Sequence, residues 1–247
     1  MSEAFHGRHS QQGLTPKKVV LGNSKRNCQK RRRQYEGATA CGEPNATIAY
    51  TDTNVNRDES TALDDEYLRT ATVGELVPLT ERILLVEYDS RWPDRFEGEA
   101  KRIRTVLGEH ALRVEHVGST SVPGLIAKPI IDIVLLVTDS RNELAYAPAL
   151  ETAGYQLRIR EPEWNEHRMF KGAAGDVNLH VFSAGCPEVD RMVTFRDWLR
   201  ANAGDRELYA QSKRVLAQTD WKYTQNYADA KTAVIQQILC KAQSAGH

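Results

Sequence analysis

The sequence lacks a charge excess of either sign and lacks long apolar runs. Its 33 basic residues are balanced by 33 acidic ones, so the chain as a whole is not suited to general polyanion binding. No run of about 18 or more apolar residues occurs, so we predict no membrane-spanning helix and no membrane partner. The first basic residues are not followed by a short apolar core, which disfavours a secretory signal.

Cysteine is also scarce. The four cysteines are scattered and form no Cys-x-x-Cys pair: Cys28, Cys41, Cys186 and Cys240. This spacing favours reduced thiols over a disulfide framework or a zinc site. Together these absences predict a cytoplasmic protein.

Large apolar residues are rare over residues 1–75, which are rich in small polar and basic residues. Such a composition cannot bury enough surface to offset the entropy of ordering, so we predict a disordered basic and polar tail. Residues 25–33 hold a basic cluster, and residues 58–66 an acidic patch. A basic cluster can bind nucleic acid through phosphate charge, but no aromatic residues interleave with this one to stack on bases. A solvated tail is therefore favoured over a binding arm, and nucleic acid is not an expected partner.

From residue 76 onward, apolar residues follow the periods of strands and helices, which predicts one α+β domain over residues 76–247. Strands are expected at residues 82–87, 112–117, 129–137, 156–160, 167–171 and 177–182. The almost wholly apolar, β-branched segment 129–137 is typical of a central strand covered on both faces. Helices are expected after Trp92-Pro93, over 141–153, from Pro187, over 206–218 and from about Trp221.

The most informative segment spans residues 116–132 and reads HVGSTSVPGLIAKPIID. Gly118 lets the backbone approach a ligand closely, while Ser119 and Thr120 add hydroxyl groups beside exposed amides that suit a phosphate. Asp132 is a carboxylate within an apolar strand, which is costly unless the carboxylate is paired or holds a metal ion. A divalent cation between Asp132 and a triphosphate would resolve that cost. His116 is grouped with these phosphate- or nucleotide-binding candidates, and it is expected to orient the Gly-Ser turn rather than to act as a ligand.

In this order and spacing, the segment resembles the Gly-Ser…Asp signature of polymerase-β-type nucleotidyltransferases. It is more closely similar to the GrpB family, whose motif reads His-x-Gly-Ser-Thr-x-x-Pro-Gly-x-x-x-Lys-Pro-x-x-Asp. The resemblance extends from Ile83 to about Ala242 and includes Asn178-Leu179-His180-Val181, Tyr209, Lys213, Tyr227 and Lys231. It implies a nucleotidyltransferase-like mixed β-sheet with flanking helices and a helical C-terminal part. The Gly-Ser…Asp order, together with nearby basic groups, predicts a nucleoside triphosphate as partner, a small-molecule or protein hydroxyl as acceptor, and Mg²⁺ or Mn²⁺ as cofactor.

One position departs from the superfamily pattern. Two-cation nucleotidyl transfer uses a second acid two residues after the first, and that position holds Val134, on the same face as Asp132. His180 is the candidate replacement for the third acid, either as a metal ligand or as a general base. Imidazole suits Mn²⁺, Zn²⁺ or Ni²⁺ better than Mg²⁺. The equally weighted alternative is a hydrogen-bonded histidine at a strand edge.

Three further basic residues are candidates for phosphate contacts: Lys128, Arg168 and Lys171. In a regular strand Arg168 and Lys171 point to opposite faces, so only one of the two is expected in the cleft. Lys128 could instead be the structural partner of a nearby acid. Two hypotheses remain open. One is a nucleotidyltransferase that uses Asp132 and His180, and the other is a non-catalytic nucleotide- or phosphate-binding module on a degenerate fold of the same kind.

Overall fold

The computed structural model describes residues 65–246. The predicted basic cluster, most of the acidic patch, Cys28 and Cys41 lie outside these residues. A helix over residues 65–71 stands where the composition predicts none, and it buries Leu68 and Ala71. An antiparallel bridge between Thr72 and Ile159 then ties the segment to the sheet. This helix lies within the segment that the composition predicts to be a tail.

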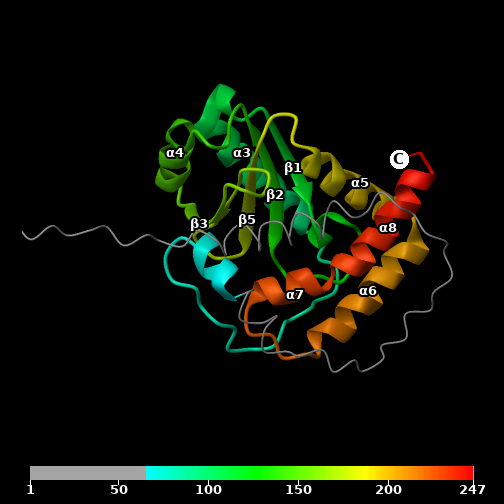
Figure 1. Cartoon of the computed structure of the whole chain (residues 1–247). Helices are drawn as coiled ribbons and strands as arrows, with labels where there is room; N and C mark the ends of the chain where they lie inside the picture. The colour runs from blue at the N-terminus through cyan, green and yellow to red at the C-terminus, as the bar shows by residue number, and fades with distance from the viewer. Residues whose placement is uncertain (1–64, 247) are drawn as a thin grey trace, which may run out of the picture.

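The centre of the molecule is a mixed five-stranded sheet in the order β1-β2-β5-β4-β3 (Figure 1). Strands β2 and β5 are parallel, and the other neighbouring pairs are antiparallel. The strands are β1 Arg113–Val117, β2 Ile131–Val137, β3 Gln156–Glu161, β4 His167–Lys171 and β5 Val177–Ser183. Five of the six predicted strands are confirmed. Ile131, Ile133 and Leu135 of β2 are fully buried, as expected for a central strand.

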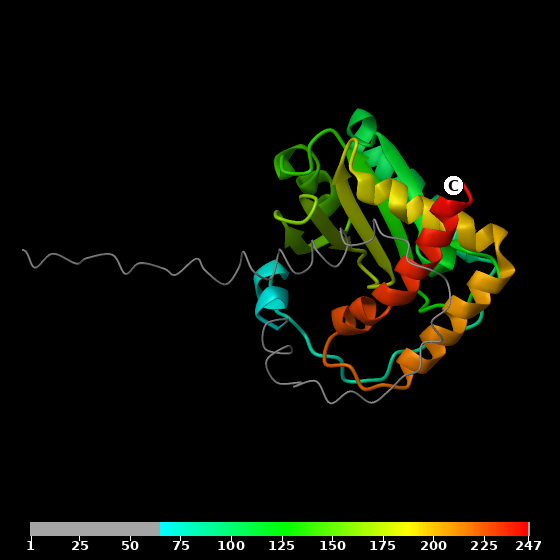
Figure 2. The same cartoon turned by 45° about the vertical axis from the view of Figure 1, so that its right-hand side comes forward.

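The helices cover the two faces of the sheet unequally. Helices α3 (Trp92–Leu107) and α4 (Ala147–Thr152) pack on the face that carries the main apolar core. The opposite side holds α5 (Pro187–Ala201), α6 (Ala203–Ala217), α7 (Thr224–Ala230) and α8 (Thr232–Ser244), which Figure 2 shows as a separate layer. The α+β class with a helical C-terminal part is thus confirmed. No helix in the described part combines the length and hydropathy needed to cross a bilayer.

A second apolar cluster fixes the C-terminal helices to the loop between β1 and β2. Val122, Leu125 and Ile126 of that loop pack against residues of α5, α6 and α8, including Leu199 and Ile238. The loop is the segment that follows the Gly-Ser turn. The position of the turn therefore depends on the helical layer as well as on the sheet.

Three local predictions were wrong in detail. Residues 82–87 form no strand, because Val86 makes only an isolated bridge to Ala127 and Leu84 is 65% exposed. The predicted helix over 141–153 is divided into a 3-10 turn, Glu143–Ala145, and α4, whose first turn contains Pro148. The last predicted helix is two helices, α7 and α8, separated at Lys231.

Candidate active site

The Gly-Ser turn brings the backbone against the carboxylate of Asp132. β1 ends at Val117, and Gly118 has φ +68°, a conformation that L side chains rarely adopt. A Cβ at Gly118 would lie 2.4 Å from Asp132 Oδ2. Glycine is therefore required here for both conformation and space. The short 3-10 helix Ser119–Ser121 follows, and Ser121 Oγ donates to the Gly118 carbonyl oxygen at 2.6 Å.

Asp132, Asn178 and His180 gather where β2 and β5 run side by side. Asp132 pairs in register with Asn178, and the Asn178 amide donates to Asp132 Oδ1 at 2.7 Å. His180 Nε2 lies 3.9 Å from the same oxygen, which is too long for a hydrogen bond. The side chain of Asp132 is 29% exposed. Burial raises the pKa of Asp132, but the hydrogen bond from Asn178 and the neighbouring charges, that of Lys231 among them, outweigh it and hold the pKa below its usual value.

The side-chain oxygen of Asn178 has no hydrogen-bond partner among the described residues, although the atom is buried. A buried amide oxygen without a donor is rare and costly in a folded protein. It lies on the residue that holds Asp132 and lines the same cleft. The oxygen therefore offers an acceptor to a ligand or cation bound beside Asp132.

His116 supports the turn from the other face of the sheet, where its ring stacks on Phe96 with 4.8 Å between centroids. Its Nε2 lies 3.1 Å from Thr120 Oγ1, and that hydroxyl donates to the Ile130 carbonyl oxygen. The Thr120 hydroxyl must then accept from His116 Nε2–H. Burial lowers the pKa of His116 to about 4, so the ring is neutral at physiological pH. His116 orients the loop, as the sequence favours.

Lys213 of α6 reaches the turn from the helical layer. Its ammonium donates to Ser119 Oγ at 3.0 Å and to the Ile126 carbonyl oxygen, and it lies over the Tyr209 ring. The residue is 1% exposed, and burial lowers its pKa to about 7. Lys213 was not among the site residues predicted from the sequence.

Three more lysines line the same cleft: Lys128, Lys171 and Lys231. Burial lowers the pKa of each, that of Lys128 to about 8, and the neighbouring Lys171 and Lys231 charges lower it further. Lys231 was also not predicted as a site residue, although a Tyr-x-x-x-Lys pattern that occurs twice in the C-terminal helices could have indicated it. Tyr209 and Lys213, like Tyr227 and Lys231, stand four residues apart, and each ammonium lies 4.7 Å from its ring centroid.

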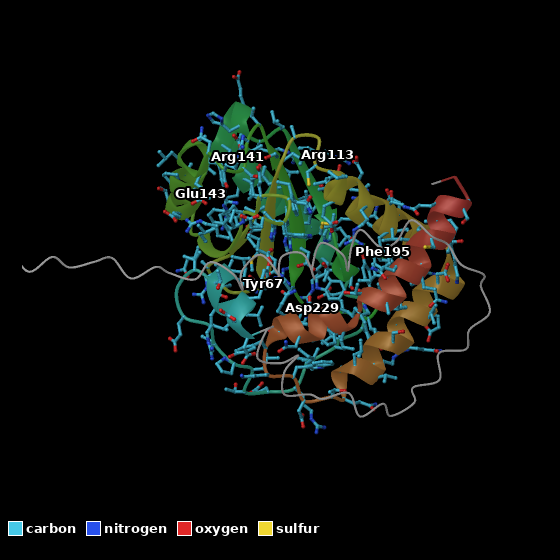
Figure 3. The ribbon with its side chains drawn as sticks, viewed as in Figure 1. Tyr67, Arg113, Arg141, Glu143, Phe195 and Asp229 are labelled. Carbon is cyan, nitrogen blue, oxygen red and sulfur yellow. The ribbon has the colours of Figure 1, made fainter. Side chains whose placement is uncertain are left out.

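These residues line one cleft of about 510 Å³ between the sheet, the helical layer and the segment after residue 65. Among the selected residues it contains Gly118, Ser119, Thr120, Lys128, Asp132, Lys171 and His180. Arg168 is not among them. Its guanidinium donates to Glu143 at 2.5 Å and to the Glu166 carbonyl oxygen, on the other side of β4 (Figure 3 labels Glu143). Lys171 lines the cleft and Arg168 does not, so the two side chains lie on opposite faces of β4.

A chain of hydrogen bonds that continues from His180 along the cleft wall was also not predicted from the sequence. His180 Nδ1 lies 3.0 Å from His167 Nε2, and His167 Nδ1 lies 2.7 Å from Glu161 Oε2. His167 and Glu161 are 4% and 5% exposed. The strand pattern could have indicated His167, because β4 places residues 167, 169 and 171 on one face.

Comparisons with known proteins agree with the pattern in the sequence. The GrpB protein family model matches residues 82–241. The UPF0157 protein BH1888 of Halalkalibacterium halodurans is 62% identical over 185 residues, which cover 75% of this chain and 95% of that protein. The crystal structure of the conserved protein GrpB from Enterococcus faecalis matches with a TM-score of 0.59 and 32% identity, covering 66% of this chain and 98% of that one.

A more distant match is the Cid1 poly(U) polymerase, with a TM-score of 0.36 and 9% identity over 64% of this chain and 48% of that one. A likeness at this level establishes neither a shared reaction nor a shared ligand.

Proposed function

The chain belongs to the GrpB family, and we propose that it transfers a nucleotidyl group from a nucleoside triphosphate to the hydroxyl of a small-molecule or protein acceptor. One observation carries this proposal. Asp132 and His180 lie 3.9 Å apart on adjacent parallel strands, and they face a cleft that also contains the Gly-Ser turn and four lysines. A carboxylate and an imidazole beside convergent phosphate-binding groups have the chemistry that phosphoryl-type transfer requires.

The lysines and the turn would bind the triphosphate. Lys128, Lys171 and Lys231 bring positive charge to a cleft where burial already disfavours their charged forms. A polyphosphate would relieve their mutual repulsion and would stabilise those charged forms. The Ser119 hydroxyl accepts from Lys213, so its own proton is directed elsewhere and can be donated to a phosphate oxygen.

The residues fit one divalent cation and do not fit two. The second-acid position is Val134, which is fully buried among Val117, Phe182 and Val189. Within residues 65–246, no group of three or more His, Cys, Asp or Glu side chains is placed to hold a metal ion. Mg²⁺ commonly binds one or two carboxylates and takes its remaining ligands from phosphate and water. Asp132 would hold such a cation, with His180 as a further ligand if the ion is Mn²⁺, and the cation would neutralise charge on the phosphates.

The protein's own groups account for the proton in the reaction. With Mg²⁺ at Asp132, His180 Nε2 stays unligated and would take the proton of the acceptor hydroxyl, and the resulting oxygen would form a bond to the α-phosphorus. The bond between that phosphorus and the bridging oxygen would break, and pyrophosphate would leave with the electron pair. The imidazolium formed at His180 would stand beside the ionised Asp132, which favours the charge.

A specific observation also supports a non-catalytic alternative. Val134 leaves Asp132 without a second acid, and such a cleft could bind a nucleotide or phosphate without turnover. Nucleotide binding that needs no divalent cation, together with an absence of transfer, would favour this alternative.

Transfer of label from α-labelled triphosphates tests the proposal. The full chain would be incubated with each triphosphate, Mg²⁺ or Mn²⁺, and pooled small-molecule or protein acceptors. We expect label transfer and pyrophosphate release, both lost in Asp132→Asn and lowered at least a hundredfold in His180→Gln. Asp139→Asn is the matched control, because Asp139 lies beyond the far end of β2 and pairs with Arg141. Transfer that persists in Asp132→Asn would exclude the proposed mechanism.

A further inference from the structure

From His180, a line of hydrogen bonds runs along one wall of the cleft to the segment that precedes the family match. Glu161 Oε1 accepts from the Tyr67 hydroxyl, and Tyr67 lies on the helix over residues 65–71 (Figure 3). Glu161 Oε2 is bonded to His167 Nδ1, and His167 Nε2 is bonded to His180 Nδ1. The line therefore joins Tyr67, Glu161, His167 and His180, and it ends beside Asp132.

The nitrogen that carries the proton in each histidine follows from the hydrogen bonds that Glu161 accepts. Both oxygens of Glu161 are engaged, and an ionised carboxylate can only accept hydrogen bonds. A neutral His167 then carries its proton on Nδ1, which leaves its Nε2 as an acceptor. His180 Nδ1 consequently carries a proton and donates to His167 across 3.0 Å. Neutral His180 then has a bare Nε2, which matches the absence of a hydrogen bond across the 3.9 Å to Asp132.

We propose that Glu161 and His167 are positioning residues that hold His180 in the Nδ1–H tautomer and direct its Nε2 lone pair into the cleft beside Asp132. This inference rests on the proposed function, in which His180 Nε2 acts as base or ligand. A proton taken up at Nε2 would leave an imidazolium whose Nδ1–H remains bonded to His167. The charge of Glu161 would stabilise it through that ring.

Packing fixes the rings as well as the protons. The His167 ring is nearly coplanar with the His180 ring to which it is hydrogen-bonded, with 19° between their planes, and it stacks on Phe182 with an angle of 25°. The Trp164 ring meets His167 edge-on at 84°. These contacts hold the His167 ring on both sides, so it cannot rotate to exchange its two nitrogens without displacing a neighbour.

Nitrogen NMR of histidine-labelled protein tests the proposal directly. Spectra of the full chain would be recorded at about pH 8.5, where an ordinary imidazole is neutral, and His180 would be assigned with His180→Gln. We expect His180 Nδ1 to carry the proton and Nε2 to give the signal of a bare nitrogen. A wild-type His180 protonated at Nε2 would overturn the proposal.

Two variants test whether Glu161 and His167 determine the tautomer of His180. In Glu161→Gln, the side-chain amide can donate to His167 Nδ1, so the Nε2–H form of His180 should increase. His167→Phe keeps an aromatic ring but removes the acceptor for His180 Nδ1–H, and it should have the same effect. Asp139→Asn is the matched control, since Asp139 lies beyond the end of β2 and pairs with Arg141. An unchanged tautomer in both Glu161→Gln and His167→Phe would contradict the proposal.

The results separate this inference from the proposed function. Label transfer by a protein whose His180 carries the proton on Nε2 would refute only the positioning role. The predicted tautomer without any label transfer would refute the proposed function and leave the role of Glu161 and His167 standing.

Discussion

The buried ammonium of Lys213 makes protein stability depend on pH within a defined window. The residue is 1% exposed, and burial lowers its pKa from 10.5 to about 7. Between these values the unfolded chain binds a proton that the folded protein does not, so the free energy of unfolding rises with pH. At about 1.4 kcal/mol per pH unit, the contribution reaches about 5 kcal/mol. The cost of burying the charged ammonium applies in full below about pH 7, and it disappears above about pH 10.5, where the ammonium is deprotonated in both states.

Urea unfolding of the wild-type protein and Lys213→Met over this pH range measures the effect. Methionine keeps most of the apolar stem and removes the ionisable group. Groups that titrate alike in both proteins cancel in the difference between their free energies of unfolding. We expect that difference, wild type minus variant, to increase by about 5 kcal/mol from pH 7 to 10.5. A difference that does not change with pH would show that Lys213 titrates as an exposed lysine and would refute the argument.

Three further outcomes follow from the geometry. Gly118→Ala should lower the free energy of unfolding by about 1–3 kcal/mol and displace Asp132, which urea unfolding and nucleotide titration would detect. Arg168→Lys should lower the free energy of unfolding but leave nucleotide affinity within about twofold. Lys171→Gln should weaken nucleotide affinity by about tenfold, or about 1.4 kcal/mol. Equal losses of affinity in the two variants would contradict the placement of Arg168 and Lys171 on opposite faces of β4. Ile133→Ala, in the fully buried centre of β2, should cost about 2–5 kcal/mol in urea unfolding, and a cost below about 1 kcal/mol would place it outside the core.

The parts of the fold that the sequence predicts well are those governed by local periodicity. β2 and α3 were predictable because their apolar residues recur at the spacing of a strand and of a helix, and each buries that face against the other. Residues 82–87 have the same apolar composition as a strand but lack a neighbouring strand, and only tertiary structure reveals that. The helix over residues 65–71 was missed because its stability depends on docking Leu68 and Ala71 rather than on composition.

In the candidate site too, some residues could be predicted from local sequence patterns and others could not. Gly118, Asp132 and His180 were predictable, since the motif and the strand alternation place them together. Lys213 comes from a helix that follows Asp132 by some 80 residues in the sequence, and Glu161 acts through two intervening histidine contacts. No local pattern encodes such proximity, which arises when the helical layer docks on the loop between β1 and β2.

Isothermal titration of the full chain with the four nucleoside triphosphates, each with and without Mg²⁺ or Mn²⁺, tests the central claim most directly. We predict saturable binding that requires a divalent cation, is lost in Asp132→Asn and persists in Asp139→Asn. Cation-independent binding would instead favour the non-catalytic alternative. An absence of binding, or binding that Asp132→Asn leaves unchanged, would contradict the assignment of this cleft to cation-assisted nucleotide chemistry.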